Sequence, residues 1–144
     1  MTGRGSRVPE PWLIHFFQRH PDDDVATATP ATDYLDSVPT TIAAEFDAIL
    51  AAVAVAPPPA FSGGGKWEAM HGDMTGIYEV RVKSGGVNYR LFCLLVRASD
   101  QLEGPSIVCL DGLTKQARSA AHPREYARIR QYVAEFRKYG KVLR

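Results

Sequence analysis

The chain has 144 residues, of which 45% are hydrophobic and 23% are charged, and its net charge is +1, so it is long enough for one domain with its own core. Its longest weakly polar run, residues 48–60, is too short to span a bilayer, and the first residues carry no apolar signal-peptide segment. These features argue against a membrane protein or a disulfide-stapled secreted domain, and the expectation is a cytoplasmic protein in which Cys93 and Cys109 are buried free thiols.

The first half of the chain predicts an arm, a strand and two helices. We expect residues 1–11 to form a disordered arm and residues 12–144 to form a single domain. Residues 12–18 are aromatic and β-branched, as in a strand, and the three aspartates of the polar loop that follows lack the spaced partners of a metal site. Residues 31–38 predict a short helix. Residues 39–55 predict a longer helix, because Pro39 suits the first helical position and apolar residues recur at helical spacing: Ile42, Phe46, Ile49, Leu50 and Val53.

The second half predicts three strands and a terminal helix. The strands cover residues 76–83, 87–96 and 106–111, after a flexible connector at residues 62–65. The helix starts near His122-Pro123, and we expect His122 to cap it. It combines an apolar stripe (Tyr126, Ile129, Val133 and Phe136) with a basic flank (Arg124, Arg128, Arg130, Arg137 and Lys138).

Charge is distributed unevenly between the two halves. Residues 1–64 carry three cations against eight acids, a net charge of −5, whereas residues 65–144 carry fourteen cations against eight acids, a net charge of +6. An anionic partner would therefore be attracted to the C-terminal half. The alternative is that the two halves neutralise each other within the fold.

The Gly85-Gly86 pair lies between two strand patterns and predicts a two-residue type I′ turn, because glycine readily adopts positive φ. This turn would pair Ser84 with Val87 and, three pairs further along, Arg81 with Arg90. Because side chains alternate along a strand, one face is then an apolar set for the helix of residues 39–55 to cover: Val80, Val82, Tyr89, Leu91 and Cys93. The other face, which the C-terminal helix would cover only in part, carries Ile77, Glu79, Arg81, Lys83, Arg90, Phe92 and Leu94.

Two arginines directly opposite each other oppose folding unless something neutralises them. Either carboxylates such as Glu79 do so, or an external polyanion does so on binding. One carboxylate against the three cations Arg81, Lys83 and Arg90 favours the polyanion, and arginine suits bidentate recognition of phosphate. The hairpin therefore predicts a cationic groove that is open at its arginine end.

Four motifs follow one another within residues 66–118: MHGDMTGIYEVRV, SGG, NYRLF and GLTK, with a basic helix after them. This ordered set resembles the phage-derived Gp49-like, HigB-type toxins of the RelE/ParE superfamily. The resemblance implies an α+β fold, a small antiparallel-rich four-stranded sheet with helices of the N-terminal half on one face and a basic C-terminal helix. It also implies the toxin of a type II toxin–antitoxin system, with a HigA-like helix-turn-helix antitoxin as its partner.

The resemblance implies an activity as well. HigB- and RelE-like members cleave mRNA, typically on the ribosome and without a metal or cofactor, whereas ParE-like members inhibit DNA gyrase and cut no RNA. The strand arginines of the family correspond to Arg81 and Arg90, and the lysine that follows the last strand corresponds to Lys115. This chain departs from the family where a second lysine and a preceding phenylalanine are common, since it has Gln116 and Leu113 there.

Metal-free RNA cleavage uses the ribose 2′-OH as nucleophile and needs a proton acceptor, cations around the phosphorane, and an acid for the leaving 5′ oxygen. We assign phosphate stabilisation to Arg81 and Arg90. Proton transfer is assigned to Lys83 and Lys115, because neighbouring cations favour the neutral form of a lysine, with His71 and His122 as competing bases. RNA binding is assigned to Arg118, His71, Arg124 and Arg128. A gyrase inhibitor and a nucleic-acid-binding module without catalysis remain as alternatives.

Overall fold

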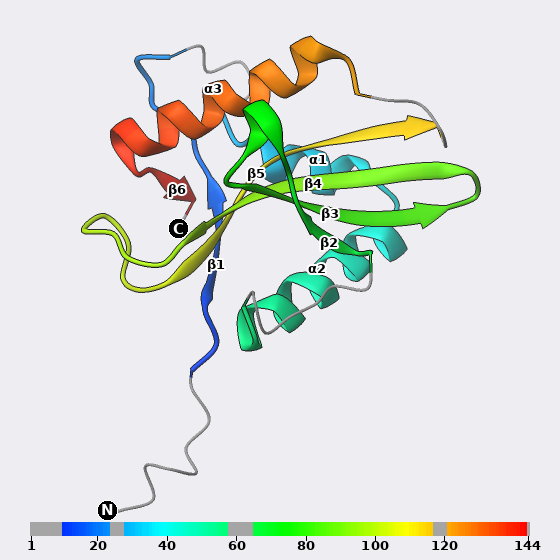
Figure 1. Ribbon diagram of the computed structural model, residues 1–144, viewed down its shortest axis with the longest axis horizontal. Helices are drawn as coiled ribbons and strands as arrows, with labels where there is room; N and C mark the ends of the chain where they lie inside the picture. Colours follow the sequence, from blue (N-terminus) through cyan, green and yellow to red (C-terminus); the bar gives the residue numbers. More distant parts are fainter. Residues whose placement is uncertain (1–9, 24–27, 58–64, 117–120, 144) are drawn as a thin grey trace, which may run out of the picture.

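A computed structural model describes residues 10–23, 28–57, 65–116 and 121–143 of the protein. Helices α1 (Pro30–Ser37), α2 (Thr40–Val55) and α3 (Pro123–Tyr139) and the 3-10 turn η2 (Gly72–Met74) surround a single sheet (Figure 1). The α+β class expected from the sequence is confirmed. The predicted arm lies outside the described residues except for residues 10–11, as do most of the predicted connector at 62–65 and Arg118.

The described sheet has six strands in the order β2-β3-β4-β5-β1-β6. Strand β1 runs parallel to β5, and the other neighbouring pairs are antiparallel. The prediction of four strands is wrong because β2 and β6, with three and two residues, are too short to show a periodic pattern. The bounds are β1 (Leu13–Phe17), β2 (Trp67–Ala69), β3 (Ile77–Ser84), β4 (Val87–Val96), β5 (Ser106–Gln116) and β6 (Val142–Leu143).

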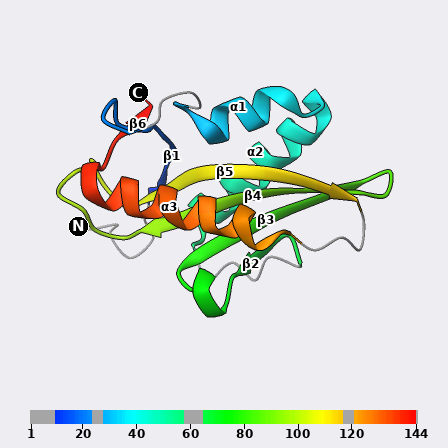
Figure 2. The ribbon, with the colours of Figure 1, turned by 90° about the horizontal axis from the view of Figure 1, so that it is seen from above.

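Helices cover both faces of the sheet. Figure 2 shows α1 and α2 on one side of the strands and α3 on the other side. The apolar face of α2, including Phe46 and Val53, packs against Val80 and Leu91 of the sheet. The stripe of α3 buries Ile129, Val133 and Phe136 against Ile77, Phe92 and Leu94. Both coverings match the faces predicted from the hairpin, and burial of each large apolar side chain contributes about 1.5–3 kcal/mol.

The helix ends follow local sequence signals. Pro39 is the N-cap of α2 rather than its first helical residue, with an extended ψ of 145°. The expectation for His122 is confirmed, because its Nδ1 accepts a hydrogen bond of 3.2 Å from the Arg124 N–H. The carboxylate of Glu125 in turn accepts one of 2.8 Å from the His122 N–H, which completes a capping box. Gly140 ends α3 with a φ of 63°, a conformation that suits glycine.

Strand β5 is longer than predicted. It was expected to end at residue 111 but continues to Gln116, because its polar last residues still pair with β4 through the backbone. Gly112 permits a close approach of α1, since a Cβ there would lie 2.1 Å from the ring of Tyr34. Lys115 consequently lies within a strand and not after it, which corrects the position inferred from the family resemblance.

The two cysteines face each other across β4 and β5. Cys93 and Cys109 are fully buried free thiols, as predicted, with their Sγ atoms 3.8 Å apart. Burial raises the pKa of the Cys93 thiol well above its usual range. A thiol that stays protonated is a poor nucleophile, so this pair contributes to packing.

Candidate functional site

The turn between β3 and β4 aligns the predicted cations. Gly85 and Gly86 have φ values of 58° and 77°, so the two-residue turn with positive φ at both positions is confirmed. The register then pairs Ser84 with Val87 and Arg81 with Arg90, as the sequence predicts. The two guanidinium groups therefore belong to opposed residues on one face of the sheet.

A second row of polar residues lies nearer the turn. Lys83 of β3 opposes Asn88 of β4, and Asn88 in turn opposes Lys115 of β5. Because directly opposed residues share a face, Lys83, Asn88 and Lys115 lie in line across three strands. The row of Arg81 and Arg90 is two residues further along on the same face, since strand residues alternate. This face is the one that α3 partly covers.

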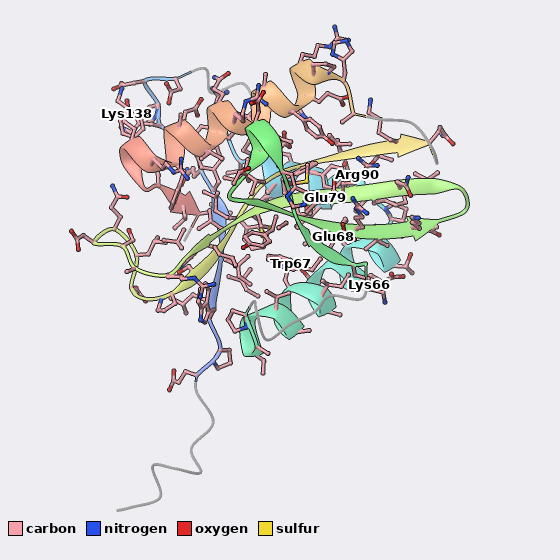
Figure 3. The ribbon with its side chains drawn as sticks, in the orientation of Figure 1. Lys66, Trp67, Glu68, Glu79, Arg90 and Lys138 are labelled. Atoms are coloured by element: carbon pink, nitrogen blue, oxygen red, sulfur yellow. The ribbon has the colours of Figure 1, made fainter. Side chains whose placement is uncertain are left out.

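A buried carboxylate neutralises the arginine pair, which corrects the prediction of an uncompensated one. Glu79 is 1% exposed and accepts a hydrogen bond from the Arg81 Nε, and its other oxygen lies 3.6 Å from Nη1 of Arg90. Glu68 of the neighbouring strand β2 lies 3.6 Å from Arg81. Figure 3 shows Glu79 beside Arg90, with Glu68 close by. The hydrogen bond to Glu79 raises the pKa of Arg81, and the two Glu79 oxygens hold both arginines as ion pairs.

The neutralising groups come from the basic half of the chain itself. Glu68 and Glu79 both lie within residues 65–144, so the negative charge of the first half is not what balances the arginines. The described ion pair that does join the halves is Arg19–Glu135, at 2.9 Å and almost fully buried. The acidic first half of the chain therefore neutralises little of the positive charge of Arg81 and Arg90.

Hydrogen-bonding capacity remains at the centre of the site. The Nε of Arg90, the Oε2 of Glu79 and the Oδ1 of Asn88 are buried without a hydrogen-bond partner. Unsatisfied buried polar groups are rare in folded proteins and often mark functional positions. The three atoms, one donor and two acceptors, belong to residues on the face of the sheet that carries the arginine pair.

Two more ion pairs connect α3 to β5 at the edge of this face. The Nζ of Lys115 lies 2.7 Å from Glu125, and this hydrogen bond lowers the pKa of Glu125. The Nε of Arg128 donates a hydrogen bond of 2.8 Å to Asp111. Burial nevertheless raises the pKa of Asp111. Lys115 and Arg128 therefore hold the first turns of α3 to the sheet.

The remaining predicted site residues lie at varying distances from the arginine pair. Lys83 is exposed, and Arg124 is exposed in the first turn of α3. His71 is exposed just before η2, at the Ile77 end of β3. Arg81 is four positions after Ile77 in the strand, which is about 13 Å at about 3.3 Å per residue. The structure thus brings Arg81, Arg90, Lys83 and Lys115 to one face but keeps His71 apart.

Tyr126 lies at the site but was not predicted there, because its place in the apolar stripe of α3 was interpreted as packing alone. Tyr126, from the apolar stripe of α3, is half-buried with its ring 6.1 Å from that of Phe92. Its phenol lies near enough to Arg81 to contribute to the raised pKa of that arginine. Tyrosine has an apolar body and a polar tip, so a stripe position beside a predicted arginine row was the available signal.

Trp67 and His20 pack against other aromatic rings. Trp67 is buried and its ring stacks on Tyr78 at 5.1 Å. His20 stacks on Tyr139 at 3.9 Å. Within the described ranges, no cluster of three or more His, Cys, Asp or Glu side chains is arranged to bind a metal ion. The same ranges contain no helix with the length and hydropathy that a bilayer crossing requires.

Comparisons with known proteins give one weak structural similarity. No family model matches the chain, and no curated protein matches it by sequence. A solved structure of the toxin–antitoxin complex RelBE2 from Mycobacterium tuberculosis contains a chain that is 17% identical, with a TM-score of 0.46. The match covers 73% of this chain and 99% of that chain.

Proposed function

We propose that the protein is the toxin of a type II toxin–antitoxin pair, that it acts in the cytoplasm, and that it cleaves mRNA on the ribosome without a metal. Its partner would be a HigA-like helix-turn-helix antitoxin. The observation that carries the proposal is the row of Arg81 and Arg90, fixed by a buried carboxylate, beside the row of Lys83 and Lys115. The ordered motifs of residues 66–118 supply the family expectation.

The arrangement supports a phosphate-binding role even though the arginines are paired. Glu79 fixes both guanidinium groups from beneath, while 39% of the Arg81 side chain stays exposed. The Nε of Arg90 lacks an acceptor. Donors that are already held in place lose little entropy when an anion binds. A bound phosphodiester would therefore meet the exposed guanidinium of Arg81 and the part of the Arg90 side chain that is exposed, 16% of it.

Each residue has a distinct role in the proposed reaction. The ribose 2′ oxygen attacks the adjacent phosphorus, a 2′,3′-cyclic phosphate forms, and the bond to the 5′ oxygen breaks. Arg81 and Arg90 stabilise the charge on the phosphorane oxygens. One of Lys83 and Lys115, in its neutral form, takes the proton of the 2′ hydroxyl, and the other, in its charged form, donates a proton to the leaving 5′ oxygen; Lys115 first leaves Glu125. Arginine itself remains protonated throughout.

A second candidate function is inhibition of a protein target, as in ParE-like toxins. The observation that favours it is the pairing of the cations, because Glu68, Glu79 and Glu125 offset much of the positive charge that RNA would require. Of the two candidate histidine bases, His71 lies apart from the arginines, and His122 uses its Nδ1 to cap α3. Such a protein would arrest growth without cutting mRNA.

Growth arrest and mRNA cleavage after expression in a bacterial host test the proposal. Lys83→Gln is the cleanest variant, because Lys83 is exposed and forms no ion pair within the described residues. Loss of one such electrostatic group is expected to lower the cleavage rate by about 10²–10³-fold. Lys138→Gln is the matched control, since Figure 3 shows Lys138 near the far end of α3, away from Arg90 and Glu79.

Arg90 needs a compensated variant. Arg90→Gln alone would leave Glu79 buried without one of its partners, so a loss of activity could reflect misfolding. Arg90→Gln combined with Glu79→Gln removes both charges and retains hydrogen-bonding amides. Primer extension on total mRNA should show discrete cleavage sites for the wild type and none for this double variant. Growth arrest without mRNA cleavage, together with loss of gyrase supercoiling activity in vitro, would exclude the nuclease and support the second candidate.

A further inference from the structure

The second half of α3 and the start of β3 enclose a groove that does not include the arginine pair. It is a hollow of about 420 Å³ whose lining includes Ile77, Arg130, Val133, Ala134 and Arg137. A second hollow of about 520 Å³ shares Arg137 and includes Leu94, Val96 and Phe136 in its lining. Together these two hollows make up the α3 groove. Because they share Arg137, they form one continuous surface along the helix.

The floor of the α3 groove is apolar. Ile77, Leu94, Val133 and Phe136 are buried core residues whose surfaces close its base. Ala134 is exposed at the centre of the first hollow. A small exposed side chain between larger buried ones leaves room for an apolar group of a partner. This composition fits an inserted protein side chain better than a solvated loop.

The rim of the α3 groove is positively charged. Arg130 and Arg137 are seven residues apart, so they lie on the same side of the helix. Among the described ion pairs neither arginine has a carboxylate partner, whereas Arg81, Arg90 and Arg128 each have one. Among the described residues, the Nη1 of Arg130 donates to the Met74 sulfur at 3.7 Å, and a thioether is a weak acceptor.

One acid also lines the groove. Asp73 faces it from η2, and Arg97 lines the second hollow together with Arg137. The two linings thus contain three arginines and one carboxylate. Arg130 and Arg137 alone outnumber that carboxylate, so the charge around the apolar floor is positive.

We propose that the α3 groove docks the antitoxin through a segment that combines apolar side chains with acidic ones. The inference rests on the proposed function and adds the surface and the chemistry of recognition. Apolar side chains of the segment would bury against Val133 and Phe136, and its carboxylates would pair with Arg130 and Arg137. RNA fits less well, because grooves that bind single-stranded nucleic acid join cations to accessible aromatic rings, and the aromatic lining residue Phe136 is buried.

The test measures binding of the product of the adjacent reading frame to the purified full chain by titration calorimetry. The double variant Arg130→Glu with Arg137→Glu is expected to bind about 100-fold more weakly, at about tenfold for each reversed charge. Lys138→Glu carries the same charge change on the same helix but lies outside both linings, and it should bind like the wild type. Circular dichroism and urea unfolding check that each variant is folded.

A third variant tests the centre of the groove without removing an arginine. Ala134→Glu would place a carboxylate four residues after Arg130 and three before Arg137, where it forms intrahelical ion pairs. Glutamate retains good helix propensity, so the fold should be kept. The added side chain occupies the groove and satisfies both arginines, so binding of the neighbouring product should fall by about tenfold.

The outcomes separate this inference from the proposed function. Equal binding by the wild type and both groove variants would overturn the docking surface and leave the toxin proposal intact. Loss of RNA cleavage, with binding of the neighbouring product retained, would identify the groove as an RNA track and also overturn the inference. If the wild type fails to bind the neighbouring product, antitoxin docking is refuted, and growth arrest alone then decides whether the toxin proposal stands.

Discussion

The ion cluster around Glu79 makes a quantitative prediction about stability. Glu79→Gln keeps the size of a side chain that is 1% exposed but removes the charge that Arg81 and Arg90 share. Removal of one partner from a buried ion pair costs about 3–5 kcal/mol. The lower end applies here, because the Arg81 side chain is 39% exposed and the Arg90 side chain is 16% exposed. We therefore expect a loss of about 3 kcal/mol in the free energy of unfolding.

Urea unfolding is the appropriate assay for this variant. With a slope of about 2 kcal/mol/M, a loss of about 3 kcal/mol lowers the unfolding midpoint by about 1.5 M. Glu68→Gln is the matched control, because Glu68 is exposed and lies 3.6 Å from Arg81. Exposed pairs are worth less than about 1 kcal/mol, so this control should shift the midpoint only slightly.

Phosphate distinguishes the proposed cause from a general loss of packing. Without the carboxylate of Glu79, Arg81 and Arg90 repel each other and can share an external anion. A phosphate site with a dissociation constant of about 1 mM would restore about 1.4 kcal/mol at about 10 mM phosphate. The wild type should gain less than the variant. If Glu79→Gln unfolds at the wild-type midpoint and phosphate stabilises both proteins equally, the carboxylate does not hold the arginines together and the reasoning is refuted.

Three further substitutions test other parts of the site and its support. Burial raises the pKa of Asp111, so its contribution to stability is greatest below the unfolded-state pKa of about 3.9 and is lost as the pH rises. Urea unfolding should therefore show the stability of the wild type relative to Asp111→Asn falling between pH 3 and pH 6. The ion pair of Glu125 lowers its pKa, so the wild type should gain stability relative to Glu125→Gln over the same rise in pH. If the unfolding free energy of each variant changes with pH just as that of the wild type does, these assignments are contradicted. Gly112→Ala should cost about 2 kcal/mol in unfolding free energy, as overpacking does, because the added Cβ would meet Tyr34 at 2.1 Å, while Gly104→Ala, which has open space, should have little effect.

Local signals in the sequence predicted the hairpin well. Two consecutive glycines define both the turn and its register, and the register determines which residues share a face. The register places Arg81 opposite Arg90. The alternation of side chains between the two faces of the sheet then divides the apolar residues between two cores. The faces of α2 and α3 followed from helical periodicity in the same way.

The charge balance of the site could not be obtained from the same signals. Glu79 was recognised on the correct face, but a count of charges treated it as one carboxylate against three cations. In the structure its two oxygens serve two arginines, and Glu68 adds a second carboxylate from β2. Strand β2 has three residues, too few for an alternation pattern, so the sequence did not show which strand borders Glu79.

The contacts between helix and sheet were beyond sequence reasoning for a different reason. The ion pair of Lys115 with Glu125 depends on how far α3 is shifted along the sheet and on its direction. Periodicity determines which side of a helix is buried but not where along the sheet the helix lies. The extension of β5 beyond Gly112 was missed because polar residues end the apolar run while backbone pairing continues.

The position of β1 between β5 and β6 has a consequence for synthesis on the ribosome. Leu13 pairs with Ser106 and Phe17 pairs with Val142, so β1 emerges long before either of its partner strands. The nascent chain can close the hairpin of β3 and β4 before β5 is made, yet β1 has no partner strand until β5 and β6 have been synthesised. Pairing across such long stretches of chain is slow, and an exposed strand edge invites association with other chains. Because the chain is synthesised from its N-terminus onward, β1 is exposed for some time before its partner strands are made. During that time a chaperone or a co-translated partner can bind the protein before its sheet is assembled.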